Sequence, residues 1–594
     1  MTGPSIAALT PPSRFPTVVF DPGEWWSALA AERFHLSRLS LNAEWWRVVC
    51  SPEIGSVVQP GTLPQFLNHV AGGELAKSGR AAGVGLAELC RPGTYRSVPA
   101  YVQAVMPVAD HLFRLNRAQS KLQFSLENGV RVRKLNYHDS GSLVSYARRR
   151  TTLSALIAQA LPDSLPPIDL LVVNVTSPED LLSAAIAVVL LRERQPRMHV
   201  CLADHGFENF TLAPHLERLR QAGTLDSVFD CVVESKEERD FVVPSVARAV
   251  TVGQFPRGFL RRQDVEPWTA PPPHDHVAPP PTTTFAAEPI FWTRVSGRRC
   301  YWSKCTFCVH NVKYVSPTAP SVREIPAAVD RLKALREGGY RSFIFSDEAL
   351  SPAILDELSR GLLESGIGIR WICRSKLERA FDRPLFERMR AAGCDEVLFG
   401  LESTSPRTLR GMDKHTEGLD APAIRRILTE ISLAGIGVHL NLMAGFPGET
   451  PEELTSSVDF AIDALRETPN ATFTLNYFTA FPATPVTVEP GPFGIKLLPV
   501  SGDMPSAFPF RPIPALRRNA RRVARVYPQL QARLESALGW DCFGTSNGAR
   551  AALGLYFLSG HSVTFKAQDE NPFRFPPRHN IEKGGKVWPF AACF

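Results

Sequence analysis

The sequence predicts an α/β protein in which a βαβ domain precedes a (β/α)6 partial barrel, and three observations support this fold class. Apolar runs of strand length alternate with helix-length segments in two separate series. A proline-dense stretch at 266–289 lies between the two series and is expected to be a semi-rigid linker. The chain has 594 residues, which suits three or four domains better than one.

The first series occupies 161–265 and is expected to form a parallel sheet. Its predicted strands are 169–175, 198–203 and 229–233, and its predicted helices are 178–194, 214–222 and 236–243. The last of these helices is expected to stop before Pro244. The preceding region, 1–160, shows helix-like apolar spacing without a recognisable motif, so we expect a separate helical region there.

The second series, at 290–485, has six strand candidates with helices between them, which predicts the partial barrel. The predicted strands are 290–295, 342–345, 370–373, 396–399, 438–443 and 472–478. The predicted helices are 322–337, 353–365, 383–392, 421–434 and 451–467. Functional residues of such a barrel lie at the carboxyl ends of its strands. The remaining residues, 486–594, are expected to form a helical region and a tail.

The composition is that of a globular protein, with 44% hydrophobic and 21% charged residues. The net charge of +7 is spread over the whole length, so there is no clustered basic face for nucleic acid. No apolar run approaches the ~20 residues of a membrane span, and the first residues lack the pattern of a signal peptide. We therefore expect a cytoplasmic protein without a membrane partner, whose 11 cysteines stay reduced.

Three cysteines, Cys300, Cys305 and Cys308, stand close together directly after the first predicted barrel strand. A closed zinc site would require a fourth ligand, which His310 could supply, so a Cys3His zinc site is one interpretation. Three thiolates without a fourth ligand fit a [4Fe–4S] cluster with one open iron.

The loop CYWSKCTFC resembles the radical S-adenosylmethionine (SAM) superfamily, and the resemblance extends over 290–485. It implies that Cys300, Cys305 and Cys308 hold a [4Fe–4S] cluster, and that Phe307 lies near the adenine of SAM. The implied reaction is reductive cleavage of SAM to a 5′-deoxyadenosyl radical, fed by an electron donor such as flavodoxin or ferredoxin. The loop departs from the commonest form, because four residues separate its first two cysteines where three are usual.

Further similarities to this superfamily follow at the ends of the second and third predicted strands. Asp347 or Glu348 would accept the methionine ammonium of SAM, since a cation needs an acidic acceptor there. An exposed acidic turn is the alternative for one of the two. Arg374 would pair with the methionine carboxylate or a cofactor amide, with a solvated arginine as the alternative.

The fourth and fifth strand ends carry two more similar segments. In the GLES segment, Glu402 and Ser403 would hydrogen-bond the ribose or the methionine of SAM. In the GFPGE turn, Gly445 and Gly448 would lie against adenine. The order of these segments on successive strand ends, more than any one of them, indicates the superfamily.

A flavodoxin-like, Rossmann-like βαβ domain placed before such a barrel resembles the cobalamin-binding branch of the superfamily. The resemblance implies cobalamin at the strand ends, with Thr176, Ser177 and Glu179 as contact residues. The Asp-x-His-x-x-Gly ligand motif is absent, so we expect no lower axial histidine and interpret His205 as a loop residue. A degenerate domain kept only for packing is the alternative.

Together these features predict a cobalamin-dependent radical SAM methyltransferase that methylates a carbon of a peptide or specialised metabolite. One alternative is a radical SAM enzyme that only abstracts hydrogen and has a vestigial sheet domain. Another, from a different class, is a non-catalytic iron–sulfur or cobalamin sensor. A tRNA methylthiotransferase is disfavoured, because the amino-terminal region has no cysteine triad for a second cluster.

Overall fold

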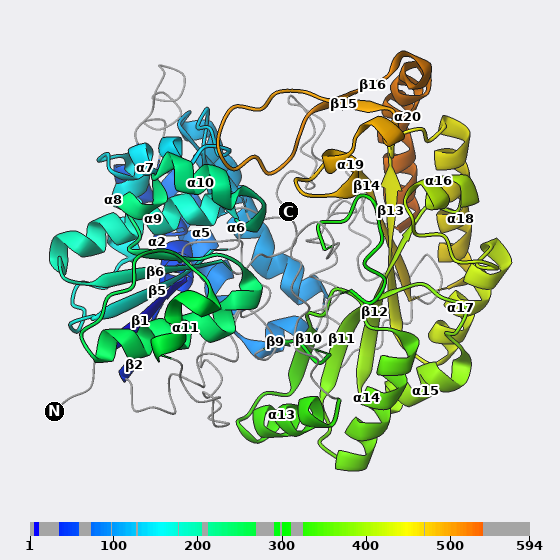
Figure 1. The fold of residues 1–594 in the computed structure, drawn as a ribbon, viewed down its shortest axis with the longest axis horizontal. Helices are drawn as coiled ribbons and strands as arrows, with labels where there is room; N and C mark the ends of the chain where they lie inside the picture. The colour runs from blue at the N-terminus through cyan, green and yellow to red at the C-terminus, as the bar shows by residue number, and fades with distance from the viewer. Residues whose placement is uncertain are drawn as a thin grey trace.

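The computed structural model describes residues 5–10, 35–58, 73–96, 98–125, 129–175, 177–204, 212–268, 290–296, 300–310, 325–468 and 470–538. Two α/β domains lie side by side, each built on a six-stranded sheet (Figure 1). Every strand pair in these two sheets is parallel, which confirms the predicted α/β class with parallel sheets. Most of the predicted linker lies outside the described residues.

The amino-terminal sheet begins much earlier than predicted. Its strands, in spatial order, are β2 (His35–Ser40), β1 (Ser5–Thr10), β5 (Leu170–Val175), β6 (His199–Asp204), β7 (Cys231–Val233) and β8 (Gly258–Leu260). The expectation of a purely helical region before residue 161 is therefore wrong. β1 pairs with β2 on one side and with β5 on the other, so distant pairing rather than local pattern makes it a strand.

Helices cover both faces of this sheet (Figure 1). The helices are α2 (Leu41–Val49), α3 (Ile54–Val57), α5 (Glu74–Leu89), α6 (Val98–Ala118), α7 (Ser140–Ala147), α8 (Thr152–Ala160), α9 (Pro178–Arg194), α10 (Leu216–Ala222) and α11 (Lys236–Thr251). A small antiparallel hairpin, β3 (Leu122–Ser125) with β4 (Gly129–Val132), packs against two of them, α6 and α9. The prediction that the last helix ends before Pro244 is wrong, because α11 continues to Thr251. The Ser245 hydroxyl donates to the Phe241 carbonyl at 2.8 Å, and the buried Val242, Val243 and Val246 anchor the helix across the proline.

The second sheet follows chain order and confirms all six predicted barrel strands. They are β9 (Ile290–Thr293), β10 (Ser342–Phe345), β11 (Arg370–Lys376), β12 (Cys394–Glu402), β13 (Gly437–Ala444) and β14 (Ala471–Tyr477). The sheet is open, with β9 and β14 at its edges. Its helices are α13 (Ile325–Glu337), α14 (Pro352–Ser365), α15 (Arg383–Ala391), α16 (Pro406–Gly411), α17 (Ala421–Leu433) and α18 (Pro451–Glu467).

The two faces of this second sheet differ in polarity. One face packs large aromatic side chains into the core, including Trp371, whose ring centroid lies 5.1 Å from that of Phe345. Because side chains alternate along a strand, Arg374 and Lys376 of β11 lie on the opposite face, inside the partial barrel.

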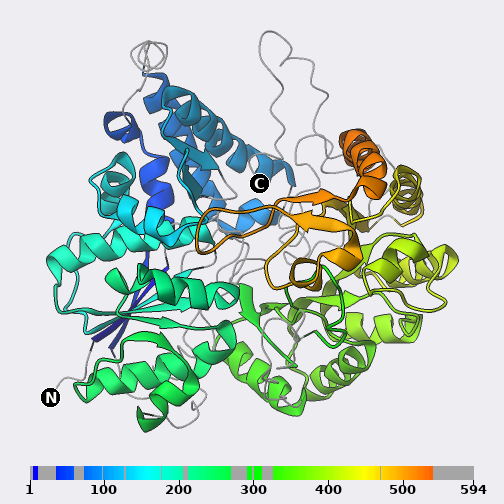
Figure 2. The same ribbon diagram turned by 45° about the horizontal axis from the view of Figure 1, so that its top comes forward.

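The segment after the barrel connects the two domains. It contains α19 (Pro485–Val488), β15 (Ile495–Leu497), β16 (Phe510–Pro512) and α20 (Pro514–Leu538). The loop between β15 and β16 extends to the amino-terminal domain (Figure 2). We call residues 501–506 of this loop the strap; its Met504 is fully buried in the core, and its backbone nitrogen donates to the His138 carbonyl at 2.9 Å.

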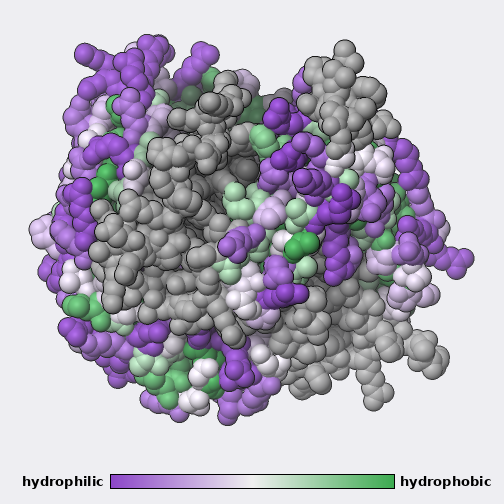
Figure 3. Space-filling view, turned by 180° about the vertical axis from the view of Figure 1, so that it is seen from behind, coloured by the Kyte–Doolittle hydropathy of each residue, from purple (hydrophilic) through white to green (hydrophobic). Residues whose placement is uncertain are grey.

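The described surface is mostly hydrophilic when the molecule is seen from behind, with hydrophobic side chains in small groups (Figure 3). Among the residues described, no helix has both the length and the apolar character needed to cross a membrane.

Candidate functional site

The cysteine loop follows β9 and is held by contacts to two distant segments. The Thr306 backbone nitrogen donates to the Met412 carbonyl at 3.0 Å, and the Trp302 indole donates to the Asp413 carbonyl at 2.7 Å. The Thr306 carbonyl in turn accepts from the Val486 nitrogen at 3.1 Å. These contacts fix the loop over the barrel without using any cysteine side chain.

None of the three cysteines of this loop is in a disulfide. Cys305 is buried, and Cys300 and Cys308 are half-buried. Burial raises the pKa of the Cys305 thiol to about 11, against the lowering effect of the Lys414 ammonium. Burial and the neighbouring Cys305 raise the pKa of Cys308 as well. Cys305 and Cys308 therefore lie close enough to the other cysteines of the loop to respond to their charge.

The donor chemistry of this loop fits an iron–sulfur cluster better than zinc. Within the described ranges, no three His, Cys, Asp or Glu side chains already surround a metal position. His310, the candidate fourth zinc ligand, lies with its Nε2 3.1 Å from a Glu348 carboxylate oxygen. Three cysteines on one loop, none of them in a disulfide, match the ligand set of a [4Fe–4S] cluster that keeps one iron open.

Glu402 and Lys414 form a buried ion pair next to the cysteine loop. The Lys414 Nζ lies 2.8 Å from the Glu402 Oε1, and the two side chains are about one tenth exposed. Gly400 provides the space, since a Cβ there would collide with the Lys414 Nζ. Glu402 has a φ of +64°, a left-handed conformation that costs a non-glycine residue about 1–3 kcal/mol. Such strain is typical of functional positions.

The acidic residues after β10 are neither exposed nor free. Asp347 is fully buried, and its carboxylate accepts hydrogen bonds from the Val295 and Ser296 backbone nitrogens at 2.8 and 3.0 Å. It therefore anchors the segment that leads into the cysteine loop. Glu348 is paired with Arg294 at 3.2 Å as well as with His310. The alternative of an exposed acidic turn does not apply to either residue.

Phe307 of the cysteine loop lies next to the buried ion pair. It packs against an apolar cluster that Met443 also contacts, and the Lys414 Nζ lies 5.8 Å from its ring centroid. Arg374, the predicted strand-end arginine, is half-buried near the carboxyl end of β11.

Ser403, the next predicted contact residue, makes hydrogen bonds to other segments of the protein. It is fully buried, its hydroxyl lies 3.2 Å from that of Ser457, and it accepts from the Ser405 nitrogen at 3.1 Å. It joins the GLES segment to α18 instead of facing open space.

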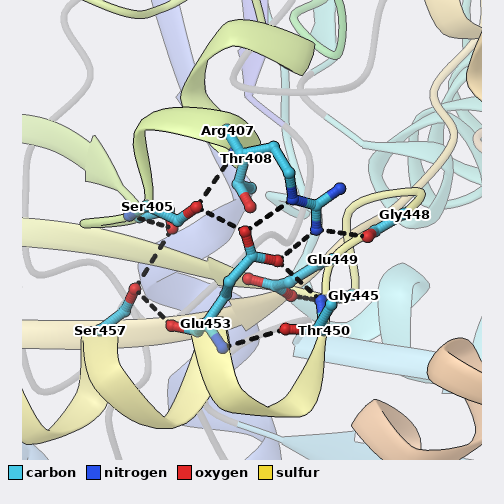
Figure 4. Close-up of polar contacts among 10 residues, drawn as sticks. Ser405, Arg407, Thr408, Gly445, Gly448, Glu449, Thr450, Glu453 and Ser457 are labelled. Carbon is cyan, nitrogen blue, oxygen red and sulfur yellow. Dashed lines mark hydrogen bonds and ion pairs between the residues drawn. The ribbon is translucent and has the colours of Figure 1, made fainter.

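A polar network links the GLES segment to the GFPGE turn (Figure 4). The Glu453 Oε1 accepts from the Ser405 hydroxyl at 2.6 Å and from the Arg407 Nε at 2.8 Å. Arg407 also donates to the Gly448 carbonyl at 2.7 Å. Burial alone would raise the pKa of Glu453, but the bonds from Arg407 and Ser405 hold it at about 2. The network fixes the two segments relative to each other.

The GFPGE turn requires its glycines and contains a residue that sequence analysis did not select. Gly445 and Gly448 have φ of +79° and +86°, and a Cβ on Gly445 would lie 2.6 Å from the Tyr477 ring.

The residue that the sequence did not reveal is Glu449, which is 3% exposed and accepts a hydrogen bond from the Gly445 nitrogen at 2.6 Å. Its Oε1 is buried without a hydrogen-bond partner, and burial raises its pKa to about 8. The sequence signal that could have identified Glu449 is its position at the end of the GFPGE turn.

Lys376, at the carboxyl end of β11, is a second missed residue. Its Nζ lies 4.0 Å from the centroid of the Trp302 ring, inside the cysteine loop. The ammonium contacts the Thr416 hydroxyl and lies 4.0 Å from Glu378, which accepts from the Tyr301 hydroxyl at 2.6 Å. The predicted strand ended at residue 373, so no sequence pattern placed Lys376 beside the cysteines.

The candidate cobalamin residues lie after β5, next to β1 in the sheet. The Ser177 hydroxyl caps α9 by accepting from the Asp180 nitrogen at 3.1 Å. Glu179 pairs with the Arg131 Nε at 2.9 Å. Thr176 and His205 lie outside the described residues. The side chains of Ser177 and Glu179 are therefore already engaged in contacts within the protein.

Comparisons with known proteins agree with this geometry. Residues 295–461 match the family described as the Radical SAM superfamily. A stretch of 185 residues is 24% identical to an uncharacterised methyltransferase of Pyrococcus horikoshii and covers 30% of this chain and 39% of that protein. A stretch of 80 residues is 38% identical to the heme chaperone HemW of Mycobacterium tuberculosis and covers 13% of this chain and 20% of that protein. The chain thus spans two fifths or less of these relatives.

A solved structure of the radical SAM methyltransferase TsrM from Kitasatospora setae, with tryptophan and a SAM analogue bound, is also similar. It has a TM-score of 0.47 and 16% identity, and the alignment covers 71% of this chain and 86% of that one. Another structure of the same methyltransferase contains cobalamin and a [4Fe–4S] cluster. The predicted resemblance to the radical SAM superfamily is therefore confirmed over residues 295–461.

Proposed function

We propose that the protein is a cobalamin-dependent radical SAM methyltransferase that transfers a methyl group to a carbon of a peptide or specialised metabolite. One observation carries the proposal: a radical SAM barrel with three cysteines after its first strand shares the chain with a second parallel sheet of doubly wound order. Taken along the chain, that order is 2-1-3-4-5-6, which extends the flavodoxin-like 2-1-3-4-5 arrangement by one strand.

In this proposal Cys300, Cys305 and Cys308 would hold a [4Fe–4S] cluster, which would supply an open iron for SAM and the electron for its cleavage. The protein contributes position and charge. Glu402 presents a carboxylate beside the cysteine loop, and Arg374 presents a cation on the inner face of β11. Gly445 and Gly448 allow close backbone approach to a flat ring.

The amino-terminal sheet would hold cobalamin at its switch point. In doubly wound sheets the ligand crevice forms where the strand order reverses, which is between β1 and β5 here. Thr176, Ser177 and Glu179 follow β5 directly and remain the proposed contacts. The methyltransferase name of the Pyrococcus relative also supports this function.

Two measurements test the proposal. The first is the absorbance of cobalamin retained by the purified protein after anaerobic reconstitution. The second is the yield of S-adenosylhomocysteine and 5′-deoxyadenosine per methylated product, where we expect one of each. 5′-Deoxyadenosine alone, unchanged when cobalamin is left out, would contradict the proposal.

The runner-up is a radical SAM enzyme that only abstracts hydrogen. The structural use of Ser177 and Glu179, one as a helix cap and one in an ion pair, favours this alternative for the sheet domain. A non-catalytic sensor is disfavoured, because a sensor has no need of the strained Glu402 or the GFPGE turn.

A further inference from the structure

We propose that Lys376 is a positioning residue that raises the reduction potential of the cluster by placing a buried, only partly compensated ammonium against the cysteine loop. This inference rests on the proposed function, in which Cys300, Cys305 and Cys308 bind that cluster. Lys376 lies on β11, outside the cysteine loop, and its contacts rather than a sequence motif point to this role.

The ammonium of Lys376 is held against the loop by the loop's own tryptophan. Lys376 is 4% exposed, and its Nζ lies 4.0 Å from the Trp302 ring centroid. Trp302 stands between Cys300 and Cys305, and its indole hydrogen bond to the Asp413 carbonyl fixes the ring. A cation on the face of a fixed, partly buried ring is a stable arrangement. The charge therefore has one position relative to the cysteines.

This charge is only partly compensated by a carboxylate. Glu378 lies 4.0 Å from the Lys376 Nζ and also accepts the hydrogen bond of Tyr301. Lys414 differs, because its ammonium is paired with Glu402 at 2.8 Å. Compared with Lys414, Lys376 thus has the less compensated positive charge.

A buried positive charge favours the reduced cluster. Reduction adds one electron from a low-potential one-electron donor and makes the cluster more negative by one charge. The net charge around a cluster is one of the factors that set its potential, and a charge in a low-dielectric interior acts more strongly than one in water. Lys376 should therefore make the cluster easier to reduce.

The chain offers a matched control in Lys304. Its Nζ lies 5.0 Å from the same Trp302 ring, and it stands between the same two cysteines in sequence, but its side chain is exposed. Water and salt screen an exposed charge. Removal of Lys304 should therefore change the potential far less than removal of Lys376.

The experiment is a redox titration of the reconstituted full chain, followed by electron paramagnetic resonance, for wild type, Lys376→Met, Lys376→Arg and Lys304→Met. We expect Lys376→Met to lower the reduction equilibrium constant at least tenfold, which is about 59 mV for one electron. Lys376→Arg should stay near wild type, and Lys304→Met should shift less than Lys376→Met. If Lys376→Met loses iron, Lys376→Gln takes its place in the comparison.

Three results would overturn the inference: an unchanged potential in Lys376→Met, an equal shift in Lys304→Met, or an equal shift in Lys376→Arg. An unchanged potential combined with weaker SAM binding would instead assign Lys376 to the substrate. Iron and sulfide content of the wild type separates this test from the proposed function. A wild type without a cluster contradicts the proposed function, whereas a present cluster with an unshifted potential contradicts only the role of Lys376.

Discussion

The Asp503 carboxylate accepts a hydrogen bond from the backbone nitrogen of Ser140, 363 positions earlier in the chain, at 2.7 Å. Ser140 begins α7, whose own cap, Asp139, serves the Ser142 nitrogen. Asp503 therefore adds a second carboxylate to the positive end of this helix. The contact belongs to the strap, so a helix of the amino-terminal domain is completed by a residue that follows the barrel.

The first prediction concerns this contact. Asp503→Asn should lower the free energy of unfolding by about 1 kcal/mol, because a charged acceptor at a helix start is replaced by a neutral one. Urea unfolding measures the change. Ser501→Ala is the control, since it removes only a 3.4 Å contact from Asn136 and should have little effect. Equal losses in both variants would show that Asp503 has no special role.

The second prediction tests the cluster ligands. Replacing Cys300, Cys305 and Cys308 together with Ala should abolish the ~400 nm absorbance of a reconstituted cluster. Cys90→Ser is the control, because Cys90 is also half-buried but belongs to the amino-terminal domain. Full iron and sulfide content in the triple variant would refute the ligand assignment.

The third prediction concerns SAM binding. Glu402→Ala and Gly448→Ala should each weaken SAM binding tenfold or more, about 1.4 kcal/mol, while the iron content stays unchanged. The first change removes the carboxylate beside the loop, and the second puts a Cβ on a backbone with φ of +86°. Gly435→Ala is the control. Gly435 also has a positive φ, +75°, and open space lies where its Cβ would be. It follows α17 and so lies outside the GFPGE turn. Wild-type affinity in both site variants would mean that SAM binds elsewhere.

The fourth prediction is a pH dependence of stability. Burial raises the pKa of Glu449 from 4.5 to about 8, so its contribution is complete below pH 4.5 and is lost as the pH rises to about 8. Its neighbours Glu453 and Tyr477 carry or can gain negative charge, and the Gly445 backbone N–H and Arg407 oppose their effect only in part. Glu449→Gln should therefore melt at a higher temperature than wild type at pH 8.5 and at a similar one at pH 5.

Glu453→Gln is the matched control for this measurement. The pKa of Glu453 is held at about 2, so its carboxylate stabilises the fold throughout the neutral range. The variant should be destabilised at pH 7, opposite in sign to Glu449→Gln at pH 8.5. Parallel melting curves of wild type and Glu449→Gln across pH 5–8.5 would contradict the role of burial.

The sequence predicted the barrel well because each of its strands is apolar, short and followed by a helix of its own. The cysteine loop and the strand-end segments could be selected for the same local reason. β1 was missed because its partner β5 is distant in sequence, so no nearby pattern marks it. Pro244 misled the prediction because packing on both sides of α11 outweighs one lost hydrogen bond.

Within the candidate site, sequence reasoning found residues but could not assign their contacts. Asp347 was selected correctly as polar and strand-terminal, yet its backbone hydrogen bonds give it an anchoring position. Lys376 and Glu449 were missed because their character comes from burial, which a spacing pattern does not reveal. Their cation–π contact and raised pKa depend on segments that meet only in the folded chain.

The place of β1 between β2 and β5 also has a consequence for synthesis on the ribosome. The Ser5 nitrogen donates to the Asp169 carboxylate at 2.8 Å across 164 positions, so β1, which leaves the ribosome long before β5, cannot complete its pairing until Asp169 has emerged. At about 5–20 residues per second this takes roughly 10–30 s. Throughout that interval β1 exposes one unpaired edge, which is a template for wrong strand pairing. Slowed translation before Asp169 should therefore increase aggregation of the nascent chain more than the same delay within the barrel.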